Sequence, residues 1–200
     1  MSEIQDFKMY IDGEWIDSSS GKKIKTLNPE NNEVWATVPE ANEMDVDRAV
    51  KSAQKAFENS WSKLHPRDRA KYLRLIADQL RTNAEHLGKV ETIDTGKLYR
   101  ETKTQASYIA EYYDYFAGLA DKVEGTVVPV DKPDMQVTTT RIPIGVVAAI
   151  IPWNSQMLLT AVKLAPALAM GNTVVIKASE LAPVTLLEFA RLIQKTGIPK

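Results

Sequence analysis

The stretch from residue 145 to residue 177, GVVAAIIPWNSQMLLTAVKLAPALAMGNTVVIK, decides the fold of this chain. Its two continuous apolar runs, VVAAII and TVVIK, have the length and composition of strands buried on both faces of a parallel sheet. Between them the pattern predicts a helix over residues 156–170, ended by Gly171, and a second helix follows over residues 183–196. A β-α-β-α order implies a right-handed crossover, so we predict an α/β fold with a Rossmann-like, doubly wound parallel sheet.

Two parallel strands do not complete a hydrophobic core, so a further strand is expected after Lys200. We therefore expect the 200 residues to be part of a longer protein. No apolar run approaches the roughly 20 residues of a membrane-spanning helix. The N-terminal segment MSEIQDFKMY is too polar for a signal peptide, so the expected location is the cytoplasm.

Charge and cysteine content exclude several classes of function. The chain has 25 basic and 26 acidic residues and a net charge of −1, so we expect it to bind neither nucleic acid nor an acidic membrane surface. It has no cysteine, which excludes disulfides, cysteine-ligated metals and a thiol nucleophile within these residues. His65 and His86 lack metal-ligand spacing, and no metal site is expected.

The first 120 residues are expected to form short strands and then helices. Residues 8–40 alternate in polarity around turn residues, and Asp12-Gly13 predicts a hairpin. Apolar residues at helical spacing predict three helices, around residues 46–57, 68–87 and 101–119.

Two details of these helices follow from single residues. Gly88 is expected to stop the second helix, because glycine favours the left-handed conformation that ends a helix. Tyr108, Tyr112 and Phe116 recur every four residues in the third helix, and this stripe is expected to face the core.

Residues 123–145, VEGTVVPVDKPDMQVTTTRIPIG, have a different character. They are rich in β-branched residues and interrupted by turn residues, which predicts an antiparallel β arm. If the arm protrudes, its open edges are expected to be covered by a partner, and the alternative is a hairpin folded against its own domain.

Candidate site residues lie where the two parallel strands end, because ligands of open α/β sheets bind beyond the carboxyl ends of the strands. Both loops are expected at the same edge of the sheet. The first loop carries Ile151, Pro152, Trp153 and Asn154, and the second carries Lys177, Ala178, Ser179 and Glu180.

Each loop offers a chemical group with two interpretations. Lys177 and Glu180 have the chemistry to hold a ribose diol, or they form an ordinary ion pair. The amide of Asn154 has the chemistry to donate to an oxygen that gains charge during attack on a carbonyl, and local pattern alone favours a helix cap instead. The chain lacks G-x-G-x-x-G and G-x-x-x-x-G-K-[ST], so any dinucleotide binds without these glycine fingerprints.

A family resemblance adds to this interpretation. PWNSQMLLTAVKLAPALAMGNTVVIKASELAP combines P-W-N, K-x-x-P-A-L, G-N-x-V-V-x-K and x-x-E-x-x-P, and it resembles the NAD(P)-dependent aldehyde dehydrogenase superfamily. The segments VETIDTGK, YYDYFAGLADKVEG and TTRIPIGVVAAIIPWN are similar to the N-terminal portion of the same family. The resemblance covers nearly the whole chain.

The resemblance implies a division of labour along the sequence. Residues 1–122 would be the N-terminal part of a coenzyme-binding domain, residues 123–145 an oligomerisation arm, and residues 146–200 the first βαβα of its sheet. The implied cofactor is NAD, with NADP possible, the implied substrate is a small aldehyde, and the implied assembly is a homodimer or homotetramer. The implied roles are an oxyanion donor for Asn154, ribose binding for Lys177 and Glu180 with Ser179 beside them, and a cofactor pocket lined by Ile151, Pro152 and Trp153.

Two departures limit what the resemblance implies. Many members have an aromatic residue and a proline after P-W-N, where this chain has Ser155 and Gln156. The family's catalytic cysteine is not among these residues, so the 200 residues alone are expected to be inactive. The alternatives are an acylating semialdehyde dehydrogenase, which passes its thioester to coenzyme A, and a non-catalytic nucleotide-binding or interaction fragment.

Overall fold

The structure is a computed structural model that describes residues 4–200, and Met1, Ser2 and Glu3 of the polar N-terminal segment lie outside the described residues. The chain opens with five short strands: β1 (Gln5–Asp6), β2 (Met9–Ile11), β3 (Glu14–Ile16), β4 (Lys23–Asn28) and β5 (Glu33–Pro39). β2 and β3 form the predicted hairpin, whose turn is left-handed at Asp12 (φ 55°) and Gly13 (φ 75°). β4 pairs with β5 in antiparallel and β1 pairs with β5 in parallel.

Helices follow: α1 (Glu43–Asn59), a 3₁₀ turn (Trp61–Lys63), α2 (Pro66–Thr82), α3 (Ala84–Thr95) and α4 (Tyr99–Leu119). Asn42 begins α1 with a capping box, in which its side chain accepts from the backbone of Asp45 and the Asp45 side chain accepts from the backbone of Asn42. The apolar spacing over residues 46–57 thus predicts α1, although Val46 and Val50 are exposed and Ala56 is the buried residue.

The continuous helix predicted over residues 68–87 is wrong, because α2 and α3 are separate helices. Asn83 joins them with φ −108° and ψ 17°, outside helical geometry. Its side-chain amide donates to the carbonyl of Gln79 at 2.8 Å, which satisfies a carbonyl of the last turn of α2. The apolar stripe continues across the break because both helices pack on the same core, so periodicity alone does not reveal it.

The predicted helix stop at Gly88 is also wrong. Gly88 lies within α3, and a Cβ there would lie 2.8 Å from the backbone of Lys103 on α4, so the glycine permits close helix packing. The helix ends instead at Gly96, which takes the left-handed conformation with φ 76°.

The aromatic stripe of α4 does not form the core as predicted. Tyr108 is 50% exposed, and Tyr112 and Phe116 lie half-buried at the margin. The inward face is displaced around the helix and consists mainly of small residues: Thr102, Ala106, Ile109, Ala110, Tyr113 and Ala117. Small side chains on this face let α4 approach α2 and α5 around the one buried tyrosine, Tyr113, and Tyr108 stays at the surface.

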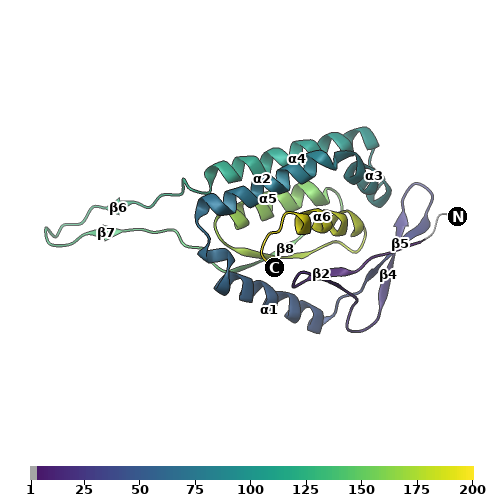
Figure 1. Cartoon of the computed structure of the whole chain (residues 1–200), viewed down its shortest axis with the longest axis horizontal. Helices are drawn as coiled ribbons and strands as arrows, with labels where there is room; N and C mark the ends of the chain where they lie inside the picture. The colour runs from purple at the N-terminus through teal and green to yellow at the C-terminus, as the bar shows by residue number, and fades with distance from the viewer. Residues whose placement is uncertain (1–3) are drawn as a thin grey trace.

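The predicted β arm is confirmed as an extended antiparallel hairpin. β6 (Val127–Val128) pairs with β7 (Val137–Thr138), and all residues of both strands are exposed. Figure 1 shows the arm projecting far from the remainder of the chain.

The α/β unit is confirmed: β8 (Val146–Ile150), α5 (Gln156–Ala169), β9 (Thr173–Lys177) and α6 (Val184–Lys195), with β8 and β9 parallel. Helices α5 and α6 contact one another, and α1 contacts both strands (Figure 1). The fold is therefore α/β with a Rossmann-like arrangement. The predicted burial of both strands on both faces is wrong for the described residues: Ala149 is the buried residue of β8, in which Ile150 is 71% exposed, and Thr173 is the buried residue of β9. Helix α1 is tied to the start of β9, where the Thr173 hydroxyl donates to the carbonyl of Ala53 at 2.9 Å.

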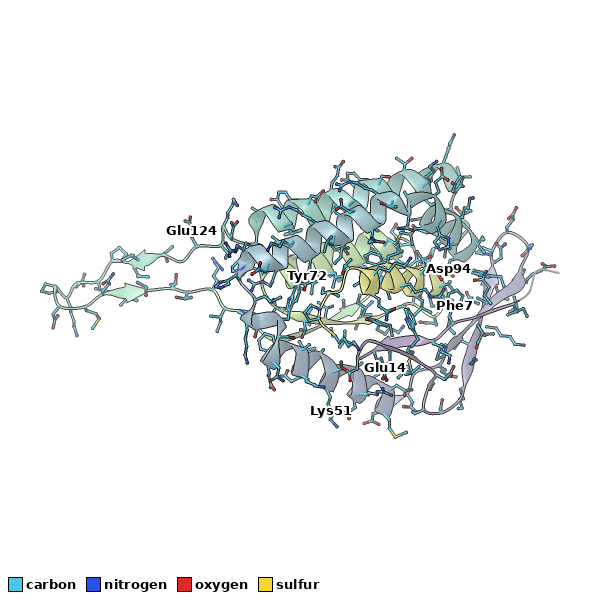
Figure 2. The ribbon with its side chains drawn as sticks, in the orientation of Figure 1. Phe7, Glu14, Lys51, Tyr72, Asp94 and Glu124 are labelled. Carbon is cyan, nitrogen blue, oxygen red and sulfur yellow. The ribbon has the colours of Figure 1, made fainter. Side chains whose placement is uncertain are left out.

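The main core lies among α2, α4, α5, α6 and the two parallel strands. Its largest fully buried side chains include Trp61, Tyr113, Phe189, Leu73, Ile76 and Met157. A smaller apolar cluster of Phe7, Ala36, Val38 and Val184 joins the N-terminal strands to the start of α6. Figure 2 shows Phe7 and Asp94 beside α6, which places α3 and the N-terminal segment against the helix that follows β9.

Candidate functional site

The two predicted site loops are neighbours in the structure. Ile150 at the end of β8 is in register with Lys177 at the end of β9, and the amide of Ile151 donates to the carbonyl of Lys177 at 3.0 Å. Parallel pairing therefore delivers both loops to one edge of the sheet, as the β-α-β pattern predicts.

Lys177 and Glu180 form an ion pair in the second loop. The Lys177 ammonium lies 2.7 Å from a Glu180 carboxylate oxygen, and the side chains are 61% and 57% exposed. The hydrogen bond from Lys177, followed by a backbone hydrogen bond, lowers the pKa of Glu180, so the carboxylate is ionised at neutral pH. An exposed pair within one loop contributes little to stability, so both groups are free to exchange partners with a ligand.

Asn154 and Trp153 are exposed in the first loop, and Trp153 is 53% exposed. The interpretation of Asn154 as a helix cap is wrong: the N-cap of α5 is Ser155, and it makes no side-chain capping bond. The Asn154 side chain is exposed and makes no hydrogen bond to the described residues 4–200. The two functional groups are thus presented at the same sheet edge.

The remaining predicted residues are placed differently from one another. Pro152 is exposed beside Trp153. Ile151 is 1% exposed and belongs to the main core, so it anchors the first loop and presents no side chain at the loop surface. Ser179 is 7% exposed, and its hydroxyl accepts from the amide of Leu181 at 3.2 Å, which shapes the second loop.

Lys97, between α3 and α4, contacts the residue that follows the first loop. Its ammonium donates to the Ser155 hydroxyl at 2.8 Å, to Glu91 at 3.2 Å and to Gln105 at 3.4 Å. The Glu91 side chain is fully buried, and burial raises its pKa although Lys97 opposes that rise.

Asp94 contacts the helix that follows the second loop. One of its carboxylate oxygens accepts from the backbone amide of Thr185 at 2.9 Å and from the Thr185 hydroxyl at 3.0 Å. Asp94 thereby caps the first turn of α6 from another helix. Burial raises the pKa of Asp94 to about 6, against the lowering effect of the Thr185 hydrogen bonds.

Gln156 connects the start of α5 to the segment between the second loop and α6. It is fully buried at the start of α5, and its side-chain amide donates to the carbonyl of Ala182 at 2.8 Å. The first loop is thus tied both to α3 and to the segment that precedes α6.

Sequence reasoning missed the contributions of Asp94, Lys97 and Gln156 to this edge. The segment VETIDTGK is visible in the sequence only as a family-like motif. A local signal was present, because two acidic residues three apart precede a glycine and a lysine at a helix end. The partner of Lys97 lies 58 residues away in the sequence and the partner of Asp94 lies 91 residues away, and periodicity does not relate residues so far apart.

Other chemistries find no support in the described part of the chain. Residues 4–200 contain no group of three or more His, Cys, Asp or Glu residues arranged to hold a metal ion. Among the helices of these residues, none combines the length and apolar character needed to span a membrane.

Comparison with known proteins agrees with the family resemblance seen in the sequence. The profile of the aldehyde dehydrogenase family matches residues 15–200. The (Z)-2-((N-methylformamido)methylene)-5-hydroxybutyrolactone dehydrogenase of Acinetobacter baylyi is 53% identical over 197 residues, which cover 98% of this chain and 40% of that protein. The cytosolic 10-formyltetrahydrofolate dehydrogenase of Xenopus tropicalis is 41% identical over 198 residues, covering 96% of this chain and 22% of that protein.

Solved structures give the same result. The crystal structure of betaine aldehyde dehydrogenase from Staphylococcus aureus in complex with NAD+ matches with a TM-score of 0.92 and 40% identity, over 96% of this chain and 39% of that chain. The present chain thus spans about two fifths or less of the length of the relatives it matches.

Proposed function

Because the chain belongs to the aldehyde dehydrogenase family, we propose that it supplies the cofactor-binding and oxyanion-stabilising parts of an NAD-dependent enzyme that oxidises an aldehyde to a carboxylic acid. The observation that supports the proposal is the parallel pairing of β8 with β9, which brings the loop of Asn154 and the loop of the Lys177–Glu180 pair to one edge of the sheet. The nucleophile would be a cysteine outside these residues, which carries the aldehyde carbon as a thiohemiacetal and then as a thioester.

Asn154 is the proposed oxyanion donor. Attack of a thiolate on an aldehyde places negative charge on the former carbonyl oxygen, and an amide held ready to donate stabilises that charge. The exposure of Asn154 in the loop that follows β8 supports this role.

Lys177 and Glu180 are the proposed ribose-binding groups. When NAD is bound it supplies the hydride acceptor. The residues fit a ribose, because an exposed ammonium and an exposed carboxylate 2.7 Å apart offer donors and acceptors to neighbouring hydroxyls. Pro152 and Trp153 would add an exposed apolar surface beside them, Ser179 would hold the second loop in shape, and Ile151 would contribute through its backbone.

The proposed assembly is a homodimer or homotetramer formed through the β arm. The exposed valines and unpaired edges of β6 and β7 support this role, since such edges are normally covered by a partner. A cytosolic location is proposed as well, on the likeness to the cytosolic 10-formyltetrahydrofolate dehydrogenase.

The proposal is tested by aldehyde-dependent NADH formation in the protein that carries this chain. Asn154→Ala is expected to lower kcat by roughly 10²–10³ without changing the dissociation constant for NAD. Asn59→Ala is the matched control, because Asn59 is an exposed amide on α1, away from the sheet edge.

The product distinguishes the alternatives. Release of the acid supports a hydrolytic dehydrogenase, whereas NADH formation only in the presence of coenzyme A identifies an acylating enzyme. NAD binding with no turnover of any aldehyde tested would refute the enzymatic proposal in favour of a binding fragment.

Glu180 is also proposed to favour NAD over NADP. A carboxylate beside the ribose diol would repel the additional phosphate of NADP, while Lys177 offsets part of the repulsion. Because the pair is exposed and screened, the expected preference is about fivefold to tenfold. Glu180→Gln is expected to narrow the kcat/KM ratio of the two cofactors, and Lys177→Ala to impair both. An unchanged ratio in Glu180→Gln would show that this carboxylate does not select the cofactor.

A further inference from the structure

The Lys97 ammonium donates to three side chains, and one of them belongs to Ser155, which follows the first loop. The acceptors are the Ser155 hydroxyl at 2.8 Å, Glu91 at 3.2 Å and Gln105 at 3.4 Å. Three acceptors on three different elements fix the position of the ammonium. Ser155 directly follows Asn154, so a fixed partner for Ser155 restricts the residue that presents the proposed oxyanion donor.

Lys97 is held against the buried end of helix α3. The Glu91 side chain is fully buried in α3, and the Lys97 side chain is 26% exposed. Gly96 ends the helix in the left-handed conformation, which allows the chain to turn so that Lys97 points back at Glu91. The hydroxyl of Thr95 accepts from the amide of Lys97 at 3.3 Å and donates to the carbonyl of Glu91 at 2.6 Å, which closes the turn.

The loop is also held from its other side. Gln156 donates to the carbonyl of Ala182 at 2.8 Å, and Asp94 caps α6 through Thr185. Ser155 is therefore bonded to Lys97 on one side, and the next residue, Gln156, is bonded to the segment that precedes α6. By contrast, the Lys177–Glu180 pair receives no hydrogen bond from Lys97, Glu91 or Gln105.

From this arrangement we infer that Lys97 is a positioning residue, which holds Asn154 in place through the hydroxyl of Ser155. The inference rests on the proposed function and adds to it the device that orients the oxyanion donor. An oxyanion donor is effective only when its position is set before the reaction, so a loosened loop should lower kcat. NAD binding should be unaffected, because the ribose-binding pair lies in the other loop.

A purely structural alternative is that Lys97 only neutralises the buried carboxylate of Glu91. Two substitutions separate these roles. Lys97→Met removes both the bond to Ser155 and the ion pair, and leaves the buried carboxylate without its partner. Ser155→Ala removes only the bond to the loop and leaves the Lys97–Glu91 pair intact. Gln105→Met is the matched control, since it removes only the longest of the three contacts and keeps the two shorter ones, to Ser155 and Glu91, which hold the ammonium in place.

The experiment measures kcat, KM for the aldehyde and the dissociation constant for NAD in the protein that carries this chain. Ser155→Ala is expected to lower kcat about tenfold, a part of the roughly 10²–10³ that complete loss of such a donor costs. Ser155→Thr retains the hydroxyl and is expected to retain kcat. Gln105→Met is expected to remain within about twofold, and NAD affinity to be unchanged in each of these variants.

Two further measurements exclude a general loss of structure. In the double variant with Asn154→Ala, Ser155→Ala is expected to cause no additional loss of kcat, because it acts through Asn154. Amide hydrogen exchange in Ser155→Ala is expected to rise over residues 152–157 and to remain unchanged in α2 and α4.

The inference is overturned if Ser155→Ala keeps its kcat within twofold, or if its loss multiplies with that of Asn154→Ala. If the wild-type protein oxidises no aldehyde, the proposed function fails by itself. Hydrogen exchange then still decides whether Lys97 holds the loop, and unchanged exchange over residues 152–157 in both Lys97→Met and Ser155→Ala would reject the positioning role.

Discussion

Asp94→Asn is expected to change how the stability of the fold depends on pH. The Asp94 carboxyl is 1% exposed, and burial raises its pKa from 3.8 to about 6. A group that binds its proton more tightly in the folded state makes folding less favourable as pH rises. Stability is therefore expected to fall between about pH 4 and pH 6 and then to level off. The shift of about 2 pKa units corresponds to at most about 3 kcal/mol.

Asp94→Asn removes this pH-dependent contribution to the free energy of unfolding and adds a contribution that does not depend on pH. The amide oxygen of asparagine would still accept from Thr185, so the cap of α6 is kept. The other carboxylate oxygen, Oδ1, has no partner among the described residues, and an NH2 group in its place would cost about 1–3 kcal/mol. At neutral pH the gain from removing the ionised buried carboxylate and the cost of the unpaired NH2 group nearly cancel. The diagnostic quantity is therefore the slope of the free energy of unfolding against pH.

Urea titrations from pH 4.5 to pH 7.5 measure the free energy of unfolding of both proteins. Over this pH range the difference between variant and wild type is expected to move in favour of the variant by about 2 kcal/mol, most of it below about pH 6.5. Asp78→Asn, at an exposed position on α2, is the control and should show no such movement. Glu91 keeps its raised pKa in the variant, so some slope remains. Parallel curves for Asp94→Asn and wild type would refute the assignment of the slope to Asp94.

Three other expectations follow from the same structure. Gly88→Ala should destabilise the protein by about 1–3 kcal/mol despite the better helix propensity of alanine, because the new Cβ would meet the backbone of Lys103 at 2.8 Å. Gly118→Ala, which meets nothing within 4 Å in α4, should be neutral or stabilising by up to about 1 kcal/mol in the same thermal melts, and the opposite order would contradict the packing argument. Deletion of residues 127–137 should lower the oligomeric mass in light scattering, and an unchanged mass with an intact fold would reject the arm as the interface. The isolated 200 residues should form no NADH with any aldehyde because they contain no thiol, and turnover that survives repurification would show that the chemistry is misplaced.

The sequence predicted those elements whose signals are local. The hairpin at Asp12-Gly13, the arm and the β-α-β-α order each follow from turn residues or from a run of one polarity. Adjacency of the strand-end loops followed too, because it is a geometric consequence of parallel pairing.

Failures occurred where tertiary packing decides between equivalent local patterns. The stripe across Asn83 is continuous in spacing, yet the helix breaks there. Gly88 could mark either a helix end or a close helix contact, and only the position of Lys103 decides. The inward face of α4 is displaced from the predicted aromatic stripe and carries Ala106, Ala110 and Ala117 together with Tyr113, and the spacing of the aromatic residues alone does not show which tyrosine is buried.

The candidate site was predictable in its exposed groups but not in its supports. Asn154, Lys177 and Glu180 stand at strand ends, which the fold pattern identifies. The supporting bonds from Lys97 and Asp94 span 58 and 91 residues, and no periodicity relates such pairs. Buried polar contacts of this kind depend on how α3 packs against α4 and α6, which a single sequence does not specify.

The two halves of the site are held in different ways, and the difference matches the chemistry proposed for each. Lys177 and Glu180 are three residues apart in one exposed loop, and such pairs contribute little energy and rearrange readily. A ribose gains its hydrogen bonds on binding, so the groups that hold it need not be fixed beforehand. Asn154 instead lies in a loop whose next two residues are both bonded to other parts of the fold. Ser155 accepts from Lys97, and Gln156 donates to the carbonyl of Ala182. Charge on a reacting oxygen exists only briefly, so its donor must already be in position. The rigid support therefore belongs on the first loop, and a substitution that loosens it should lower kcat, whereas one that disturbs the exposed ion pair should act on cofactor affinity.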